Sequence, residues 1–234
     1  MKEEIKTPEK VVLLDFCETV VKFQSADRYV FFVSDSKPVF SLKLKKLTYK
    51  IFVKFRLVRI LTRLFPQASV NKKLILYRLK GYSYNELNKL ACDYYNSEIK
   101  PQIIDSTIKL LREYQSLGYR IIIVSGGYDI YIKFFADDYD IKDVVSSRIG
   151  FSSGICTGKL LGKDCLWDNK VILLEQYLKD ADIRIDKANS IAISDSLSDI
   201  PILNYVENQI IVHRVDKEKW FEKFNYTNVI LWEK

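Results

Sequence analysis

The sequence predicts an α/β fold, with a doubly wound, mostly parallel sheet and an inserted helical segment. Short apolar, β-rich runs alternate with helical stretches along most of the chain, which is typical of a parallel sheet covered on both faces. A segment from 21 to 100 differs from the rest in charge and in periodicity. A chain of 234 residues is long enough for one such core plus an insertion.

The first predicted strand is the short apolar run at 11–16, which has the acid Asp15 near its end. The insertion follows it and is predicted to be mostly helical. Its middle, from 42 to 65, carries apolar residues at helical spacing with cations between them. Ser83 to Glu86 has the capping-box pattern, which predicts a second helix through about position 96.

Beyond position 101 strands and helices alternate. A helix from 101 to 117 ends at Gly118, a residue suited to helix termination. The later predicted elements are a strand at 120–124, a helical stretch, a short strand at 143–146, a β-hairpin over 149–161, a helix at 169–178, a strand at 190–194, a helix from 200, and strands at 209–212 and 229–232. Because the carboxyl ends of parallel strands meet at one edge of a sheet, we expect Asp15, Ser125 and Asp195 to lie close together.

Charge divides the chain in the same way as periodicity. Between positions 22 and 80 fifteen Lys and Arg residues stand against two acids, a net charge of +13, whereas the whole chain carries +7. We therefore predict an α/β core domain formed by 1–20 and 101–234, and a strongly basic helical domain at 21–100. This charge indicates an anionic partner, with a solvated basic face as the alternative.

Several protein classes are disfavoured. The first six residues have no apolar stretch behind their charges, so no signal peptide is expected. The chain has no run of about 18 uncharged apolar residues, so no membrane span is expected either. The four cysteines form no C-x-x-C pair, which favours free thiols in a reducing cytoplasm. We predict a cytoplasmic protein.

Four motifs stand in order along the chain. They are Asp15-Phe16-Cys17-Glu18-Thr19, Ile123-Val124-Ser125-Gly126-Gly127, the region from Gly162 to Lys170, and Ser194-Asp195-Ser196-Leu197-Ser198-Asp199-Ile200-Pro201. Together they resemble the four motifs of the haloacid dehalogenase superfamily. The third motif and the helical insertion resemble the phosphoserine-phosphatase-like branch. The resemblance implies a Rossmann-like core of this superfamily, with 21–100 as the cap over the active site.

The resemblance also implies a Mg²⁺-dependent phosphatase that hydrolyses a phosphate monoester through an aspartyl-phosphate on Asp15. A carboxylate nucleophile and a phosphate repel each other unless a divalent cation neutralises both, and Mg²⁺ prefers oxygen ligands. The implied metal ligands are Asp15, Asp195 and the backbone carbonyl of Cys17, with Asp199 holding a metal-bound water or orienting Lys170. The implied phosphate-binding groups are Ser125, the Gly126 amide and Lys170.

Cys17 departs from the family pattern, which has a second aspartate two residues after the nucleophile as general acid–base. A thiol, with a reference pKa of about 8.5, is a poor substitute. Loss of a general acid–base commonly costs about 10²–10⁴-fold in rate. As a side chain, Cys17 is alternatively a small buried hydrophobe.

Three interpretations of this departure are open. The leaving group is acidic enough to depart without a proton, and the aspartyl-phosphate is hydrolysed slowly or passed to another acceptor, as in a phosphotransferase. Alternatively, Glu18 acts as a substitute acid. In the third interpretation, the protein is a catalytically weakened relative that binds a phosphorylated ligand in a regulatory role.

The basic cap bears on substrate and partners. Its charge favours a polyanionic substrate or surface, and the aromatic and cationic residues from 49 to 65 suit an interfacial amphipathic helix. We therefore predict a small-molecule or lipid phosphate as substrate, and peripheral contact with the inner face of an anionic membrane. The alternative is that these apolar residues form the cap's own core. Nucleic-acid binding is disfavoured because no nucleic-acid module is recognisable. The single histidine, His213, is assigned no role.

Overall fold

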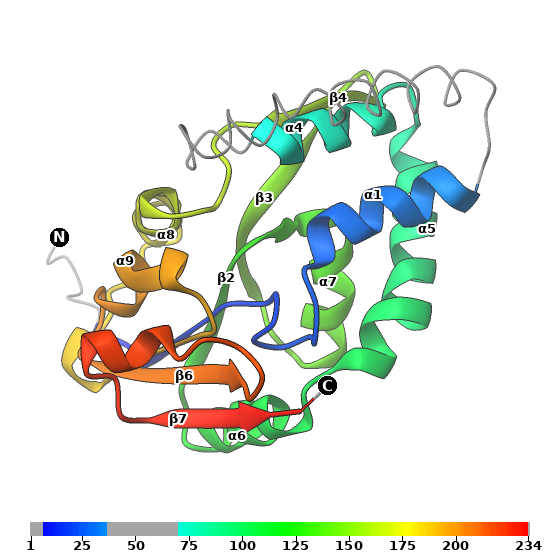
Figure 1. The fold of residues 1–234 in the computed structure, drawn as a ribbon. Helices are drawn as coiled ribbons and strands as arrows, with labels where there is room; N and C mark the ends of the chain where they lie inside the picture. Colours follow the sequence, from blue (N-terminus) through cyan, green and yellow to red (C-terminus); the bar gives the residue numbers. More distant parts are fainter. Residues whose placement is uncertain (1–6, 37–69, 234) are drawn as a thin grey trace, which may run out of the picture.

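The computed structural model describes residues 7–36 and 70–233. In this part of the chain seven strands form one sheet in the order β4-β3-β2-β1-β5-β6-β7 (Figure 1). The strands are β1 (Val11–Leu14), β2 (Arg120–Tyr128), β3 (Asp143–Ser152), β4 (Ile155–Leu161), β5 (Ile191–Ser194), β6 (Asn208–Arg214) and β7 (Val229–Trp232). All neighbouring pairs run parallel except β3 and β4. The predicted α/β class with a mostly parallel sheet is confirmed.

Helices cover both faces of the sheet. The helices are α1 (Ser25–Ser36), α4 (Val70–Leu76), α5 (Tyr84–Tyr94), α6 (Asp105–Ser116), α7 (Asp129–Asp138), α8 (Asp168–Asp180) and α9 (Ile200–Leu203). Because side chains alternate along a strand, Val12 and Leu14 of β1 join the apolar layer under α6 and α7. Val11 and Leu13 join the layer under α8 and α9. The sheet is therefore doubly wound, with α7 and α8 on opposite sides (Figure 1).

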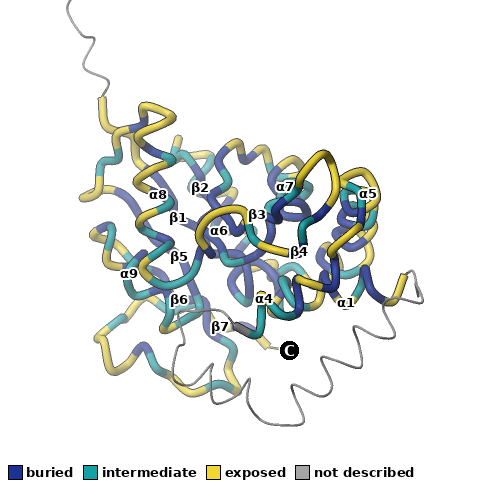
Figure 2. The backbone as a smooth tube through the Cα atoms, turned by 90° about the horizontal axis from the view of Figure 1, so that it is seen from above, coloured by how far each residue is buried: buried dark blue, intermediate teal, exposed yellow. Residues whose placement is uncertain are grey.

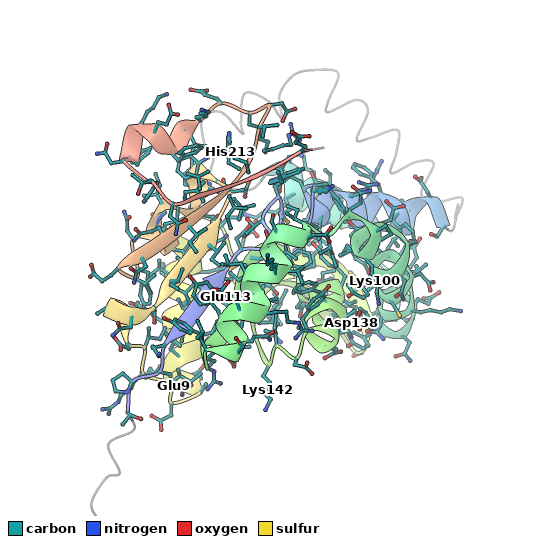
Figure 3. All side chains as sticks on the ribbon, turned by 90° about the horizontal axis from the view of Figure 1, so that it is seen from below. Glu9, Lys100, Glu113, Asp138, Lys142 and His213 are labelled. Atoms are coloured by element: carbon teal, nitrogen blue, oxygen red, sulfur yellow. The ribbon has the colours of Figure 1, made fainter. Side chains whose placement is uncertain are left out.

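Helices α1 and α5 of the insertion pack against α7. Buried tyrosines make this contact: the ring centroid of Tyr29 on α1 lies 5.4 Å from that of Tyr94 on α5 and 5.3 Å from that of Tyr131 on α7. At the end of the insertion, Lys100 Nζ lies 2.9 Å from an oxygen of Asp138 on α7 (Figure 3). The insertion thus shares one apolar layer with the sheet.

Part of the predicted cap lies outside the described residues. This applies to the helix expected over 42–65, to the amphipathic stretch at 49–65 and to most cations of the basic window. The division into a core at 1–20 and 101–234 and a cap at 21–100 stays a prediction.

Local signals placed the helix at Ser83 correctly. Glu86 N donates to Ser83 Oγ at 3.2 Å, and Ser83 N donates to the Glu86 carboxylate at 3.0 Å, so the expected capping box is present. Helix α6, in contrast, begins at Asp105 rather than at 101. Ile104 N donates to Val20 O at 2.8 Å, and this pairing keeps the chain extended where the insertion returns to the sheet.

Strand β3 is longer than the sequence indicated. A short strand was expected at 143–146 and a separate hairpin at 149–161, whereas β3 is one strand from Asp143 to Ser152. Its first half pairs with β2 and its second half with β4, so two different partners hold one continuous strand. Such a change of partner leaves no mark in the local sequence.

The sheet forms the buried centre of the described chain, and exposed residues gather on the outer turns and helices (Figure 2). None of the described helices is long and apolar enough to cross a membrane. The four cysteines carry free thiols, and three of them, at 17, 156 and 165, are buried.

Candidate active site

A cavity of about 300 Å³ opens at the carboxyl ends of β1, β2 and β5. It is lined by Asp15, Cys17, Gln24, Ala26, Asp27, Asn71, Lys72, Ser125, Gly126, Leu166, Lys170, Asp195, Ser196, Ser198 and Asp199. All seven side chains or amides that the sequence nominated lie on this wall. They come together because parallel strands end at the same edge of the sheet.

A buried lysine joins two acids at the base of the cavity. Lys170 Nζ on α8 donates to Asp15 Oδ1 and to Asp199 Oδ2, each at 2.7 Å. Burial lowers the pKa of Lys170, but the two carboxylates raise it further, so the net shift is upward and the ammonium stays charged. Burial also raises the pKa of Asp15 to about 6, with Lys170 opposing and Asp199 reinforcing that shift. Lys170 thus orients one oxygen of Asp15 and leaves the other side of the carboxylate toward Thr19.

Asp195 at the end of β5 converges on the same point. Thr19 Oγ1 lies 3.1 Å from Asp15 Oδ2 and 3.4 Å from Asp195 Oδ1, so one hydroxyl bridges the two carboxylates. Burial and the nearby charges of Asp15 and Asp199 raise the pKa of Asp195 well above its usual range. This excess of buried negative charge fits a divalent cation.

The donor set suits Mg²⁺ in particular. Among the described residues no three Asp, Glu, His or Cys side chains form a complete metal cage. Mg²⁺ does not require one, since it usually keeps several waters and takes one or two carboxylates. Asp15 and Asp195 would be these two ligands.

The last part of β2, where its pairing with β3 shifts register between Ser125 and Tyr128, offers groups for an anion. Ser125 is fully buried, and its Oγ accepts a hydrogen bond from Gly127 N at 3.1 Å, which leaves the hydroxyl proton available to the cavity. A Cβ atom at Gly126 would stand 2.5 Å from Leu166 Cδ2, so a side chain there would require Leu166 to move. Gly126 lines the cavity, and its backbone borders it without a side chain between them.

Cys17 lies where the family places its general acid. Its sulfur is 3.0 Å from Ser25 Oγ, which in turn is 2.7 Å from the hydroxyl of Tyr131. Burial, reinforced by the charge of Asp15, raises the pKa of the Cys17 thiol to about 11. The thiol is therefore protonated at neutral pH and is a weak acid.

The contacts of Glu18 argue against a role as substitute general acid. Its carboxylate accepts a hydrogen bond from Gln24 Nε2 at 2.8 Å and pairs with Lys217 Nζ at 2.7 Å. Burial alone would raise the pKa of Glu18, but Lys217, Gln24 and Arg214 hold it below its usual value. The residue also has a φ of 57°, a left-handed conformation that is uncommon outside glycine. Glu18 is not among the residues that line the cavity.

The segment after β6 contacts Asp195. Trp220 Nε1 donates to the backbone oxygen of Asp195 at 2.9 Å, and Lys217 Nζ lies 3.9 Å from Asp195 Oδ2. His213 on β6 (Figure 3) is buried, and its ring packs edge-on against Phe221 at a centroid distance of 4.9 Å. It is not among the residues that line the cavity.

Sequence reasoning missed several residues of the site. Thr19 belongs to the first motif, so a signal for it existed. Lys72, by contrast, is one of fifteen cations in the basic window and has no local feature that singles it out. Lys72 Nζ donates to Gly126 O at 2.5 Å and to Ser147 Oγ at 3.0 Å, and it forms a short ion pair with Asp164.

The doubly wound sheet, together with the lysine-linked aspartates at its strand ends, defines an α/β enzyme. A family model of haloacid dehalogenase-like hydrolases matches residues 12–204. The chain therefore belongs to the haloacid dehalogenase-like hydrolase family.

Individual relatives agree with this assignment. A phosphoserine phosphatase of Lactococcus lactis subsp. lactis is 30% identical over 95 residues, which are 41% of this chain and 43% of that relative. The matched stretch thus spans less than half of the curated relative.

Solved structures share the fold. A protein of unknown function from Bordetella pertussis Tohama I superposes with a TM-score of 0.78 at 16% identity, covering 96% of this chain and 99% of the other. A phosphoserine phosphatase solved as a phospho-aspartyl intermediate analogue gives a TM-score of 0.56 at 20% identity, covering 88% and 87%.

Proposed function

We propose that this protein is a Mg²⁺-dependent phosphatase that hydrolyses a small phosphate monoester through an aspartyl-phosphate on Asp15. One observation carries the proposal: the carboxylate of Asp15 shares a cavity with Ser125 and Gly126 of β2, and Lys170 Nζ donates to Asp15 Oδ1 at 2.7 Å. The family membership and the structural neighbour solved as a phospho-aspartyl intermediate analogue support the same chemistry.

In the first step, Asp15 Oδ2 attacks phosphorus and the bond from phosphorus to the ester oxygen breaks with its electron pair on that oxygen. Ser125 Oγ and the Gly126 amide donate to the equatorial phosphoryl oxygens, where negative charge accumulates. Lys170 keeps Asp15 ionised and in line. In the second step, water attacks the same phosphorus and releases inorganic phosphate and the free Asp15 carboxylate.

Mg²⁺, bound by Asp15 and Asp195, would neutralise the repulsion between the carboxylate and the phosphate. Asp199 accepts hydrogen bonds from Lys170 and Ser194, so its carboxylate is bound by groups of the protein itself. We assign it the role of orienting Lys170.

This mechanism lacks a strong acid to protonate the leaving oxygen. The Cys17 thiol donates poorly, and the Glu18 carboxylate is engaged by Lys217 and Gln24. Hydrolysis is therefore expected to be fastest for esters with acidic leaving groups. The same observation favours a second candidate function, transfer of the phosphoryl group from Asp15 to an acceptor other than water.

Contact with an anionic membrane is a separate part of the proposal. It depends on the basic window, most of which lies outside the described residues. Co-sedimentation with anionic vesicles at low salt tests it, and absence of binding there would remove it.

The central experiment compares wild type, Asp15→Asn and Asp195→Asn for phosphate release from 4-nitrophenyl phosphate with and without Mg²⁺. Asp93→Asn, an exposed acid on α5, is the matched control. We expect both site variants to lose activity and the control to keep it, and Mg²⁺ to raise the melting temperature of wild type but not of Asp195→Asn. Wild-type turnover that survives Asp15→Asn would overturn the nucleophile.

A further inference from the structure

The segment that joins β6 to β7 (Figure 1) contacts the residue that directly follows β5. Its short 3-10 helix, Trp220–Phe224, begins with Trp220, whose Nε1 donates to the backbone oxygen of Asp195 at 2.9 Å. Lys217 on the same segment has Glu18 as its nearer partner: its Nζ is 2.7 Å from Glu18 Oε1 and 3.9 Å from Asp195 Oδ2. Of these two contacts with Asp195, the one from Trp220 is the hydrogen bond.

Packing around the same segment holds the indole of Trp220. Phe221, the next residue, is buried, and its ring packs against that of His213 on β6 at a centroid distance of 4.9 Å. The ring of Tyr226 lies 6.1 Å from that of Trp220, and the Tyr226 hydroxyl donates to Asn204 Oδ1 at 3.0 Å. The indole N–H is thus presented by a side chain whose neighbours are themselves fixed by packing and hydrogen bonding.

The backbone of Asp195 lies just beyond the part of β5 that the sheet holds. The last residue of β5 that pairs with β6 is Ser194, which lies opposite Ile211. One Cα atom carries both the peptide oxygen and the carboxylate of Asp195, so a hydrogen bond that fixes the peptide limits the directions in which the carboxylate points. Hydrogen bonds from outside the set of ligands orient metal ligands in this way.

A second tryptophan in the same part of the sheet has a different environment. Trp232 at the end of β7 is buried, and among the described residues its Nε1 has no hydrogen-bond partner. The guanidinium of Arg214 lies over its ring, 5.8 Å from the centroid. Trp232 is therefore a packing residue, whereas the half-buried Trp220 directs its N–H at a candidate metal ligand.

We infer that Trp220 is a positioning residue of the Mg²⁺ site, and that its N–H fixes the backbone of Asp195 so that the carboxylate is preorganised for the cation. The inference rests on the proposed Mg²⁺-dependent function and deepens it. Partners outside the set of ligands commonly contribute about 10–100-fold to metal affinity or activity. Because Trp220 contacts the backbone of the ligand and not its carboxylate, we expect an effect at the lower end of that range.

The test measures the Kd of Mg²⁺ for the full chain by isothermal titration calorimetry, without substrate. Trp220→Phe keeps an aromatic ring and loses the N–H, and Trp232→Phe, which loses an N–H without a partner among the described residues, is the matched control. We expect Trp220→Phe to raise the Kd of Mg²⁺ about tenfold, and Trp232→Phe to change it by less than about twofold. The rise in melting temperature on adding Mg²⁺ should shrink in Trp220→Phe alone.

Kinetics with 4-nitrophenyl phosphate separate positioning from a general loss of structure. Trp220 is not among the residues that line the cavity. Trp220→Phe should therefore need about tenfold more Mg²⁺ for half-maximal rate, while its kcat at saturating Mg²⁺ stays within about threefold of wild type. A fall in kcat that saturating Mg²⁺ does not restore would overturn the inference. A wild-type Kd in Trp220→Phe, or an equal rise in both variants, would overturn it as well.

A fluorescence measurement keeps the indole of Trp220 intact, so the answer does not depend on whether Trp220→Phe folds. The chain has three tryptophans, and in the double variant Trp167→Phe, Trp232→Phe the remaining one is Trp220. We expect Mg²⁺ to change its emission with the Kd found by calorimetry, because a divalent charge then lies beside the residue that the indole contacts. Unchanged emission over the same titration would overturn the inference.

Binding and turnover separate this inference from the proposed function. If wild type binds Mg²⁺ and hydrolyses no ester, the phosphatase proposal fails, and the Kd values of the two variants still decide the role of Trp220. A wild type that binds no Mg²⁺ at millimolar concentrations would overturn both.

Discussion

Replacing Cys17 with Asp restores the acid that the family carries two residues after its nucleophile. The new carboxyl would lie where the Cys17 sulfur now stands, 3.0 Å from Ser25 Oγ, so a hydroxyl is in place to orient it. We expect Cys17→Asp to accelerate hydrolysis of alkyl phosphates, whose alkoxide leaving groups require a proton.

The magnitude follows from the acidity of the two groups. The thiol has a pKa of about 11 in this site, because burial and the charge of Asp15 both disfavour the thiolate. A carboxylic acid starts from a pKa of about 3.9 and is raised by the same surroundings toward the range suited to proton transfer. General acid–base catalysis contributes about 10²–10⁴-fold, which corresponds to roughly 3–5 kcal/mol of barrier.

The assay measures kcat/KM for ethyl phosphate and for 4-nitrophenyl phosphate, whose phenolate leaves without a proton. Cys17→Asp should raise the rate on ethyl phosphate by about 10²-fold or more, and on 4-nitrophenyl phosphate by less than about tenfold. Cys17→Ser, which is similar in size but no stronger as an acid, is the control and should resemble wild type. An ethyl phosphate rate that does not change in a folded Cys17→Asp protein would refute the reasoning, since the proton would then come from another group.

Three further predictions concern charged groups around the site and the sheet. Lys72→Met removes the ion pair of the buried Asp164 and should lower the free energy of unfolding by about 3 kcal/mol, measured by urea titration. Lys73→Met, on the exposed side of α4, is the control and should leave that free energy unchanged. Equal urea midpoints for the two variants would contradict this prediction. Glu18→Gln should keep turnover within about threefold of wild type, because Lys217 and Gln24 hold Glu18 ionised. A loss of about 10²-fold would instead identify Glu18 as the general acid for the leaving group. Asp143→Asn should cost about 2 kcal/mol at pH 7, because Arg120 donates two hydrogen bonds to Asp143, at 2.7 and 2.9 Å. Burial raises the pKa of Asp143, but hydrogen bonds from Arg120 and Tyr177 bring that pKa below its usual value. The stabilisation by Asp143 is therefore fully present above the unfolded pKa of about 3.9 and is lost as pH falls through the folded pKa. A stability difference between wild type and Asp143→Asn that stays constant down to about pH 2 would argue against this.

The fold was largely predictable because its signals are local. An apolar run that ends in an acid, as at 11–14 before Asp15, marks a buried parallel strand wherever it packs. The capping box at Ser83 marks a helix start through contacts within one turn. Elements shaped by distant partners were predicted less well, as the length of β3 and the start of α6 show.

For the site, the sequence by itself determined which residues stand at the strand ends. Asp15 and Asp195 each follow a recognisable strand, and Ser125 lies in the last part of β2. Parallel strands bring their carboxyl ends to one edge whatever the side chains elsewhere. Lys170 was nominated from the third motif, and the structure places its Nζ 2.7 Å from Asp15, 155 residues away in the chain.

Only the tertiary structure decided which ion pairs and hydrogen bonds the other polar side chains around the site form. Ser25 and Tyr131, 106 residues apart, form the hydrogen-bonded surroundings of Cys17. Lys217 engages Glu18, and Lys72 is paired with Asp164. Pairings of this kind depend on which helices pack against which strands, and a charged residue carries no local trace of its partner. The pattern of the chain therefore brings the strand-end residues of the candidate site together, while packing between distant segments sets their acidity and their ion pairs.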